Sequence, residues 1–266
     1  SPTMPTPLRR VILLGAPGVG KGTYARRLAP LFGLTHVVVG DLVRAQIRAG
    51  TELGRAIAET THRGDLVDDD VILRLLTEHL RAAGLDGPEG GFMLDGVPRT
   101  LGQARAVDAL LRPTLALHLT MDEGVMLHKM AARRLGRDER VYNVAYIRRG
   151  GWDMPPLLPE PTVWDADTST LRCAHGVALA PNEHVGCARC TAGLRTREDD
   201  TVDVCRHRLA TYATETRPLV QQYAPIRLDF EIDGGVEQCL PRLLALLRAR
   251  DAEPRGGAPA APGARL

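Results

Sequence analysis

The sequence predicts an α/β fold in which a parallel sheet is flanked by helices. The first observation is an apolar, strand-like run over residues 11–15 that ends in a glycine-rich turn, after which Lys21 and Thr23 open a stretch with helical spacing. The second is that strand-like and helix-like segments continue to alternate along the chain. Such alternation is typical of strands that pair in parallel and are covered by helices.

The glycine-rich turn has the residues that a phosphate-binding loop needs. Phosphate groups are densely negative, so they require several backbone N–H groups pointing inward, and only glycines let the backbone curl that tightly. We expect Lys21 to reach the outer phosphates and the Thr23 hydroxyl to ligate Mg²⁺. An ordinary turn is the alternative, but the strand before it and the helix after it argue against that reading. The glycines concerned are Gly15, Gly18, Gly20 and Gly22.

Apolar runs and glycine positions predict the elements in order. Gly33, Gly50 and Gly64 mark the ends of helical segments. The expected strands cover residues 11–15, 36–39, 91–95, 115–120 and 227–233. The expected helices cover residues 21 to about 31, 41–48, 52–61, 68–80, 123–135, a long stretch through Arg208 to Tyr223, and 236–250.

Residues 137–200 differ in character from the sequence on either side. Prolines cluster at 155–161, both tryptophans lie here, and helical periodicity is lost. We therefore expect a subdomain inserted between core segments. The proline-rich residues 1–8 are expected to form a flexible leader, and the tail, rich in Ala, Pro and Gly, to be disordered. The expected tail covers 251–266, and the expected core segments cover 9–37, 68–136 and 201–250.

Composition limits the classes of partner. With 44% hydrophobic and 25% charged residues among 266, the composition is typical of a soluble globular protein. No apolar run approaches the roughly 20 residues of a membrane-spanning helix, so we expect a cytoplasmic protein with no membrane partner. The net charge of +2 indicates no broad nucleic-acid-binding surface. Five cysteines, an odd number, argue against a disulfide framework.

A second motif follows the strand at residues 91–95. It reads Gly91-Phe-Met-Leu-Asp95-Gly-Val-Pro-Arg99-Thr-Leu-Gly-Gln103, and an aspartate that closes a buried strand beside a phosphate-binding loop can hold Mg²⁺. Together with Gly15-Ala-Pro-Gly-Val-Gly-Lys-Gly-Thr23, this motif resembles the adenylate kinase family of nucleoside monophosphate kinases. The resemblance extends over most of the chain. It implies a P-loop NTPase core, an acceptor-binding segment over residues 38–67, a lid over 137–200 and a monomeric protein.

The resemblance implies Mg²⁺-dependent, reversible transfer of the terminal phosphoryl group of ATP to AMP. Arginines suit this reaction, because it requires alignment and charge neutralisation more than covalent chemistry; the alternative for any single arginine is a solvated surface charge. By position, the resemblance assigns catalysis to Lys21, Arg99, Arg133, Arg197 and Arg208. It assigns ATP binding to Gly15, Gly18, Gly20, Lys21, Gly22, Thr23, Lys129, Arg133 and Arg140. It assigns acceptor binding to Val39, Arg44, Val67, Gly96, Arg99 and Gln103, and Mg²⁺ to Thr23 and Asp95.

Two positions depart from the family pattern. Val39 stands where the family typically has a threonine that helps recognise the adenine of AMP, whereas Gln103 retains an amide that favours AMP. Lys129 stands where the family usually has an arginine that stacks on the donor's adenine, and lysine has no flat face. An alternative function is therefore transfer to another nucleoside monophosphate or to a phosphorylated or phosphonate metabolite. A third is a nucleotide-binding interaction module without turnover, which the long lid would suit.

The lid carries a possible zinc site. Cys187 and Cys190 resemble half of the zinc knuckle of adenylate kinases with metal-bearing lids, and Cys173 with His175 would complete it. His184 is an alternative fourth ligand, and unligated thiols are the alternative to a metal. We expect the remaining two cysteines, Cys205 and Cys239, to be packed small residues on helices, and we assign no role to the other histidines.

The lid is also longer than is usual in the family, with residues 143–172 as extra sequence. Trp152 and Trp164 within it either anchor the insertion on the core or contact an unusual substrate, and the sequence does not separate these roles. Asp199 and Asp200 lie where the family places acidic residues that order the lid, and the two also suit the N-terminus of the next helix.

Overall fold

The computed structural model describes residues 8–87, 89–197 and 200–252. Most of the expected leader and tail lies outside these ranges. Leu8, expected in the leader, is buried, and its backbone N–H donates to Asp251 Oδ1 at 2.7 Å. Asp251 belongs to the last helix, which continues to Ala252. The two ends of the described chain therefore hold each other, slightly beyond the expected limits of the core.

Within the described residues, five parallel strands form the central sheet in the order β12-β4-β1-β3-β2. β1 lies in the middle, with Ile12 opposite Leu94 of β3 and Ala116 of β4. These three side chains are fully buried, as expected for parallel strands covered on both faces. The predicted parallel sheet is confirmed. Its strands are β1 (Arg10–Leu14), β2 (Thr35–Val38), β3 (Phe92–Asp95), β4 (Leu115–Thr120) and β12 (Arg227–Glu231).

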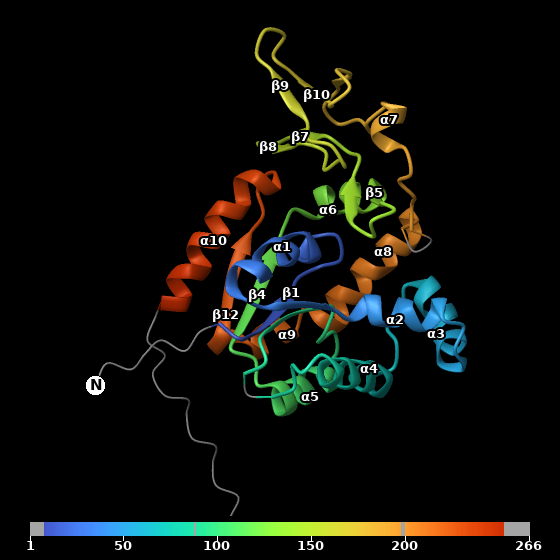
Figure 1. The fold of residues 1–266 in the computed structure, drawn as a ribbon, viewed down its shortest axis with the longest axis vertical. Helices are drawn as coiled ribbons and strands as arrows, with labels where there is room; N and C mark the ends of the chain where they lie inside the picture. Colours follow the sequence, from blue (N-terminus) through green and yellow to red (C-terminus); the bar gives the residue numbers. More distant parts are fainter. Residues whose placement is uncertain (1–7, 88, 198–199, 253–266) are drawn as a thin grey trace, which may run out of the picture.

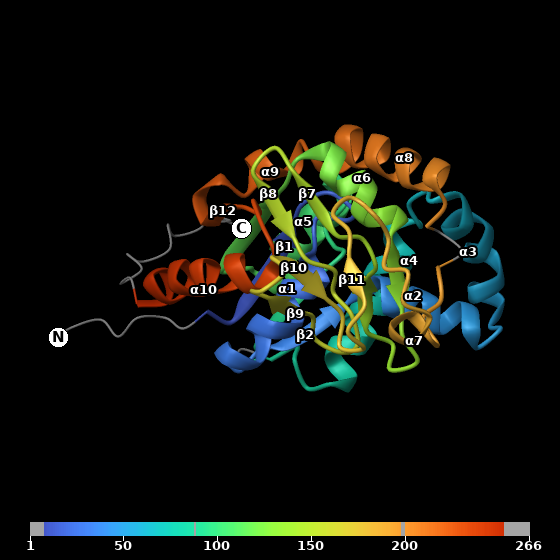
Figure 2. The ribbon, with the colours of Figure 1, turned by 90° about the horizontal axis from the view of Figure 1, so that it is seen from above.

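Helices cover both faces of this sheet (Figure 1, Figure 2). On one face α1 and α10 pack against Val11 and Leu13, and on the other α4, α5 and α9 pack against Ile12 and Leu14. Among the described residues, no helix has both the length and the apolar character that crossing a membrane requires. The helices outside the lid are α1 (Lys21–Leu28), α2 (Val39–Arg48), α3 (Glu52–Arg63), α4 (Asp69–Ala82), α5 (Leu101–Leu111), α6 (Glu123–Ala131), α8 (Val202–Thr211), α9 (Leu219–Gln222) and α10 (Val236–Ala252).

Two helices end earlier than the sequence predicts. The helix expected over 123–135 ends at Ala131, and Arg133–Leu135 form strand β5 instead. The prediction is wrong here because β5 pairs with β6 (Val141–Asn143), and strand pairing outweighs local helix propensity. The long stretch through Arg208 to Tyr223 is divided by a wider, π-helical turn over Tyr212–Thr216.

The inserted residues form a lid of short antiparallel hairpins, which lies beyond α6 and the start of α10 in the view of Figure 1. Trp152 packs, partly buried, against the main apolar cluster, whereas Trp164 is 53% exposed. The anchoring role therefore fits Trp152 alone. The remaining lid elements are β7 (Ile147–Arg149), β8 (Trp152–Met154), β9 (Val163–Asp165), β10 (Thr170–Arg172), β11 (Ala178–Leu179) and α7 (Ala188–Thr191).

Candidate active site

The phosphate-binding loop joins β1 to α1 and curls around its own lysine. Lys21 Nζ donates to the carbonyl oxygens of Gly15 at 2.7 Å and of Ala16 at 3.1 Å. Gly18 has a φ of +82°, and a Cβ at this residue would lie 2.4 Å from Met130 Cγ on α6. Only glycine fits this approach. The loop therefore holds the ammonium group at the N-terminus of α1, where backbone N–H groups and the helix dipole favour an anion.

Asp95 ends β3 beside the first turn of α1. A Cβ on Gly22 would lie 3.2 Å from Asp95 Oδ2, so the missing side chain lets the carboxylate come close to the helix. His36 on β2 faces the same carboxylate, with Nε2 3.8 Å from Oδ2. Thr23 and Asp95 line one cavity. A hydroxyl and a carboxylate are oxygen donors of the kind that Mg²⁺ prefers, so this corner fits the ion.

Burial has the largest effect on the pKa of both Lys21 and Asp95. It lowers the pKa of Lys21 to about 8; the charge of Asp95 opposes this shift, while the charges of Arg99 and other arginines add to it. Burial raises the pKa of Asp95, but nearby His36 and Lys21 more than offset this, so the pKa of Asp95 lies below its ordinary value. The carboxylate is therefore ionised at neutral pH and can hold a cation.

A buried carboxylate, Asp200, holds two of the arginines to which the sequence assigns catalysis. Arg133 Nε donates to Asp200 Oδ2 at 2.7 Å, and its Nη2 donates to Oδ1. Arg208 Nη1 lies 3.8 Å from the same Oδ1. Thr201 caps α8, because its hydroxyl accepts a backbone N–H of the helix at 3.4 Å. Asp200 therefore aligns arginines rather than capping the helix, and Asp199 lies outside the described residues.

A cavity of about 600 Å³ brings most of the predicted site residues together. It runs from the phosphate-binding loop toward α2 on one side and toward the lid on the other. Arginines from several separate segments of the chain line it. The predicted residues that line it are Gly15, Gly18, Gly20, Lys21, Gly22, Thr23, Arg44, Asp95, Gly96, Arg99, Lys129, Arg133, Arg140, Arg197 and Arg208.

Three predicted acceptor-binding residues do not line this cavity: Val39, Val67 and Gln103. Val39 is buried at the start of α2, and Val67 packs against the apolar core. Gln103 Nε2 donates to Asp69 Oδ1 at 2.9 Å, and its Oε1 accepts the backbone N–H of Arg99 at 2.8 Å. Both ends of this buried amide are therefore engaged within the protein. Contact between these residues and an acceptor stays a prediction.

Comparison with known proteins accounts for this geometry. A family model described as adenylate kinase matches residues 13–227. This chain belongs to the adenylate kinase family. It is 35% identical over 246 residues to "Probable adenylate kinase 1, chloroplastic" of Oryza sativa subsp. japonica, a match that covers 91% of this chain and 76% of the relative. It is 35% identical over 251 residues to "Adenylate kinase 1, chloroplastic" of Arabidopsis thaliana, with 91% and 78% covered.

A relative named for a different activity matches as well. The "GTP:AMP phosphotransferase" of Plasmodium falciparum is 28% identical over 231 residues, which cover 85% of this chain and 91% of the relative. The chain is thus an enzyme of the nucleoside monophosphate kinase class within the adenylate kinase family. The predicted P-loop core and lid have the arrangement of this fold.

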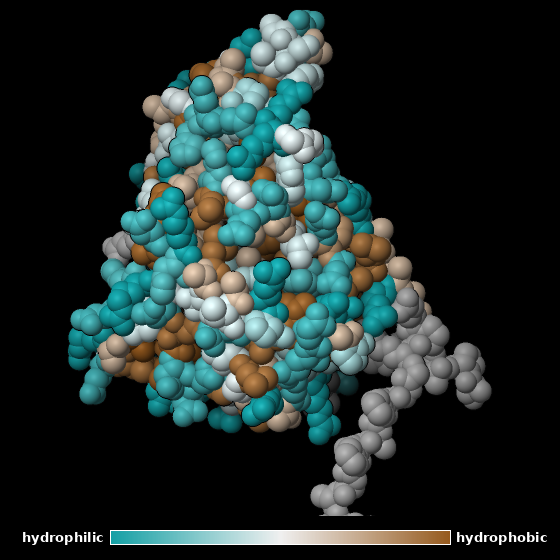
Figure 3. Space-filling model, turned by 180° about the vertical axis from the view of Figure 1, so that it is seen from behind, coloured by the Kyte–Doolittle hydropathy of each residue, from teal (hydrophilic) through white to brown (hydrophobic). Residues whose placement is uncertain are grey.

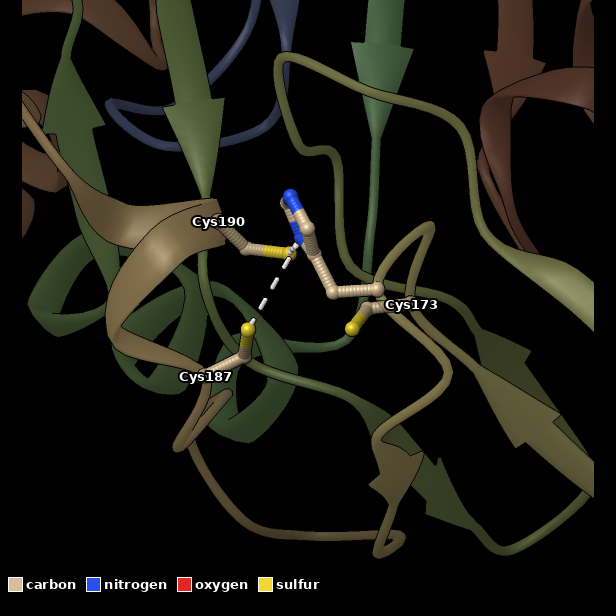
Figure 4. Close-up of side chains that lie close together, drawn as sticks. Cys173, Cys187 and Cys190 are labelled. Carbon is tan, nitrogen blue, oxygen red and sulfur yellow. Dashed lines mark hydrogen bonds between the residues drawn. The ribbon is translucent and has the colours of Figure 1, made fainter.

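The lid of this adenylate kinase family member gathers the four predicted zinc ligands. Cys173, His175, Cys187 and Cys190 have ligand atoms within 4.8 Å of one another, and the three thiols point toward a common centre (Figure 4). His175 Nδ1 lies 3.1 Å from Cys190 Sγ and 3.9 Å from Cys187 Sγ. Donor atoms around a tetrahedral Zn²⁺ lie about 3.5–3.8 Å apart, so the set fits that ion.

The structure also decides between the two candidate histidines. His175 belongs to the cluster, whereas the ring of His184 packs edge-on against His128 with 6.1 Å between centroids. None of the cysteines forms a disulfide. Burial raises the pKa of Cys190, and the adjacent thiols raise it further. Thiolates crowded in this way are favoured when a cation lies among them. Cys239 is buried on α10, as expected.

Two features of the site were missed by the sequence prediction. His36, which was given no role, lies beside Asp95; the register of β2 against β3 places both residues on one face of the sheet. The second feature is a wall of the cavity formed by Met154, Pro155 and the segment 157–159 of the insertion. The proline cluster was the only sequence signal for this wall, and it does not indicate which surface the prolines cover.

Proposed function

We propose that the chain is an ATP:AMP phosphotransferase, in which the terminal phosphoryl group of ATP is transferred reversibly to AMP. The observation that carries the proposal is that one cavity contains the phosphate-binding loop and arginines from both sides of it. Arg44 and Arg99 lie on the side of α2, while Arg133, Arg197 and Arg208 come from the lid side. This distribution of charge suits two phosphate-bearing ligands, one on each side of Lys21.

The residues would act by alignment and charge. Lys21 and the loop N–H groups would bind the outer phosphates of the donor, in place of the carbonyl contacts that Lys21 makes now. Arg44 and Arg99 would orient the acceptor phosphate through paired hydrogen bonds. Arg133 and Arg208, held by Asp200, would stabilise charge on the transferring group. Thr23 and Asp95 would hold Mg²⁺, which when bound neutralises charge on the phosphate oxygens.

The direct test is formation of ADP from ATP, AMP and Mg²⁺ by the purified chain. We expect Lys21→Met to lower kcat by at least about a hundredfold, because this variant removes the charge inside the loop. Arg148→Met is the matched control, since Arg148 is an exposed cation of the lid hairpin outside the cavity. The proposal fails if the folded protein binds ATP but forms no ADP, or if both variants lose activity equally.

A second candidate is a different phosphate acceptor, and the surroundings of the acceptor side favour testing it. Val39 offers no hydrogen bond, and the amide of Gln103 is engaged by Asp69 and Arg99. A panel of AMP, dAMP, GMP, CMP and UMP with ATP as the donor tests this candidate. A preference for AMP by orders of magnitude would remove it. Weak turnover of all five would favour a phosphorylated or phosphonate metabolite instead.

We also propose that the lid holds a structural Zn²⁺ through Cys173, His175, Cys187 and Cys190. Metal analysis of the purified protein tests this, with one Zn²⁺ per chain expected. A monomer is the proposed state, and Figure 3 shows apolar side chains in small groups on the face in view. The compartment stays a prediction: we expected the cytoplasm, while two relatives are named chloroplastic.

A further inference from the structure

The phosphate-binding loop divides the cavity into two halves. The half toward α2 contains Arg44, Gly96 and Arg99, which suit the phosphate of an acceptor. The other half lies toward α6, α10 and the lid, and we call it the donor half. If the donor's phosphates occupy the loop, its base and sugar must extend into the donor half, because the acceptor occupies the opposite one. The donor half is lined by Tyr24, Lys129, Met154, Pro155, Leu158 and Val236.

One wall of the donor half is apolar and comes from the inserted lid segment. Met154 and Leu158 are each 7% exposed, and Leu157 and Pro159 lie beside them. The wall rests directly on the core, since a Cβ on Gly235 would lie 3.2 Å from Pro155 Cδ. A slot with such walls accepts the flat face of a purine without distinguishing one purine from another. Discrimination must therefore come from polar groups at the edge of the slot.

Lys129 contributes a cationic group to the lining of the donor half. Its Nζ would lie 3.9 Å from a Cβ on Gly20, next to the phosphate-binding loop. It contacts the thioether of Met121, with Nζ 3.8 Å from Sδ. No carboxylate of the described residues lies within ion-pair distance of this ammonium group. Burial lowers the pKa of Lys129 to about 8, with Cys239 acting slightly in the opposite direction. The ammonium group is thus poorly compensated and faces the cavity.

Purine bases differ in the hydrogen-bonding groups that they present to an ammonium group. Guanine and hypoxanthine present two acceptors side by side, O6 and N7, and lysine is a common partner for this pair. Adenine presents N7 beside an amino group, which is itself a donor and opposes a nearby ammonium group. A lysine also has no planar surface on which adenine could stack. The edge of the donor half therefore favours a purine with oxygen at position 6.

We propose that Lys129 is a specificity-determining residue that admits 6-oxo purine nucleoside triphosphates, GTP and ITP, as phosphoryl donors alongside ATP. The proposal rests on the proposed function, because it assumes that the loop holds the donor's phosphates. In this arrangement the apolar wall of the insertion packs against the face of the base, and the ammonium group of Lys129 donates to O6 and N7 of the base. ITP lacks the 2-amino group of GTP, so comparison of GTP with ITP isolates the contribution of that group, and comparison of ITP with ATP tests the preference for oxygen at position 6.

The test is a donor panel of ATP, GTP and ITP with AMP as the fixed acceptor, and kcat/KM is measured for each donor. We expect GTP and ITP to equal or exceed ATP. Lys129→Met should reduce the ratio of GTP to ATP by about tenfold or more, the size expected for a lost base-edge contact. Lys129→Arg keeps a cation that can donate to O6 and N7, so this variant should retain the use of GTP and ITP that Lys129→Met loses. Arg148→Met, an exposed change on the lid, should leave the ratio unaltered.

The outcomes separate this inference from the proposed function. ADP formation from ATP and AMP, together with GTP and ITP used at least a hundredfold less well, would overturn the inference and leave the proposed function intact. Use of GTP but not ITP would overturn the contact between Lys129 and O6. Stabilisation by each nucleotide in the absence of AMP, measured as a Tm shift, provides a second readout. GTP and ITP should raise Tm in the native chain, and this shift should be smaller in Lys129→Met.

Discussion

The central sheet and the lid are stabilised by different means. In the sheet, Ile12, Leu94 and Leu117 are completely buried between layers of helices, and each strand pairs with its neighbours along its length. In the lid, the strands are two or three residues long, and buried side chains such as Leu171 belong to the same apolar cluster as the three lid cysteines. The sheet lies within a large apolar core, to which the lid contributes a smaller set of buried side chains, its three cysteines among them.

The stability of the core and the stability of the lid therefore have different origins. Short hairpins bury too little apolar surface to offset the entropy of ordering them, so a metal can supply what the lid's core lacks. The core sheet needs no such ion. We therefore expect a rigid nucleotide-binding core and a lid whose order depends on metal at the Cys and His cluster.

Removal of the lid metal should give the largest effect. We expect Cys190→Ser, or a chelator, to disorder residues 147–194 while the sheet stays folded, because metal binding to such sites contributes on the order of 10 kcal/mol. Both tryptophans of the chain, Trp152 and Trp164, lie in the lid. Their fluorescence should therefore change on metal loss, and hydrogen exchange should accelerate in the lid but not in β1, β3 or β4.

Cys239→Ser is the matched control for that experiment. Cys239 is a buried cysteine of α10 that lies outside the cluster, so the same substitution there should leave zinc content at one per chain. Two results would contradict the division of the molecule. One is zinc loss without any change in tryptophan fluorescence. The other is simultaneous loss of protection in the lid and in the central strands.

The sequence predicted the sheet better than the lid, and the physical reasons are specific. β4 was placed correctly over 115–120, because a long buried run leaves little choice of partner. Arg133–Leu135 were predicted as helix, because their strand state depends on Val141–Asn143 and on Arg195, which lie elsewhere in the sequence. Short strands carry weak local signals, and distant pairing decides their conformation.

The residues of the site also differ in how well the sequence predicts them. The phosphate-binding loop could be predicted because its backbone geometry requires glycines in a fixed order, and Lys21 lines the cavity as expected. The engagement of Gln103 by Asp69 could not be predicted, since it depends on how α4 lies against α5. The apolar wall at 157–159 was missed for a similar reason: packing between the lid and α10, not the composition of the segment, directs it toward the cavity.

Matched leucine truncations in the core and in the lid should have effects of intermediate size on stability. Leu117→Ala in β4 should lower the free energy of unfolding of the whole chain by about 3 kcal/mol, since Leu117 is fully buried. Leu171→Ala in β10 should cost about 2 kcal/mol, the lower end for a buried leucine, and affect the lid transition only. Denaturant unfolding followed by tryptophan fluorescence for the lid and by far-UV circular dichroism for the core separates the two. Equal shifts of a single shared transition would show that the lid and core unfold together.

The smallest expected effect is the pH dependence of donor choice. Because burial lowers the pKa of Lys129 to about 8, its ammonium group loses a proton as the pH rises from 7 to 9. The ratio of kcat/KM for GTP to that for ATP should then fall, by about tenfold at most. Lys21 also titrates near pH 8, but it contacts phosphates common to both donors, so its effect cancels in the ratio.

Two other titratable groups lie near Lys129, and both are kept in the Lys129→Arg variant. They are the Cys239 thiol of α10 and the Tyr24 phenol of α1, and burial raises the pKa of Tyr24 well above this range. Lys129→Arg keeps its charge throughout, so its ratio should change with pH only as far as the guanine base titrates. A native ratio that follows the Lys129→Arg ratio across this range would show that the ammonium group of Lys129 does not contact the base. A fall confined to the native enzyme would show that a titratable cation of the core, opposite a wall supplied by the lid, selects the donor.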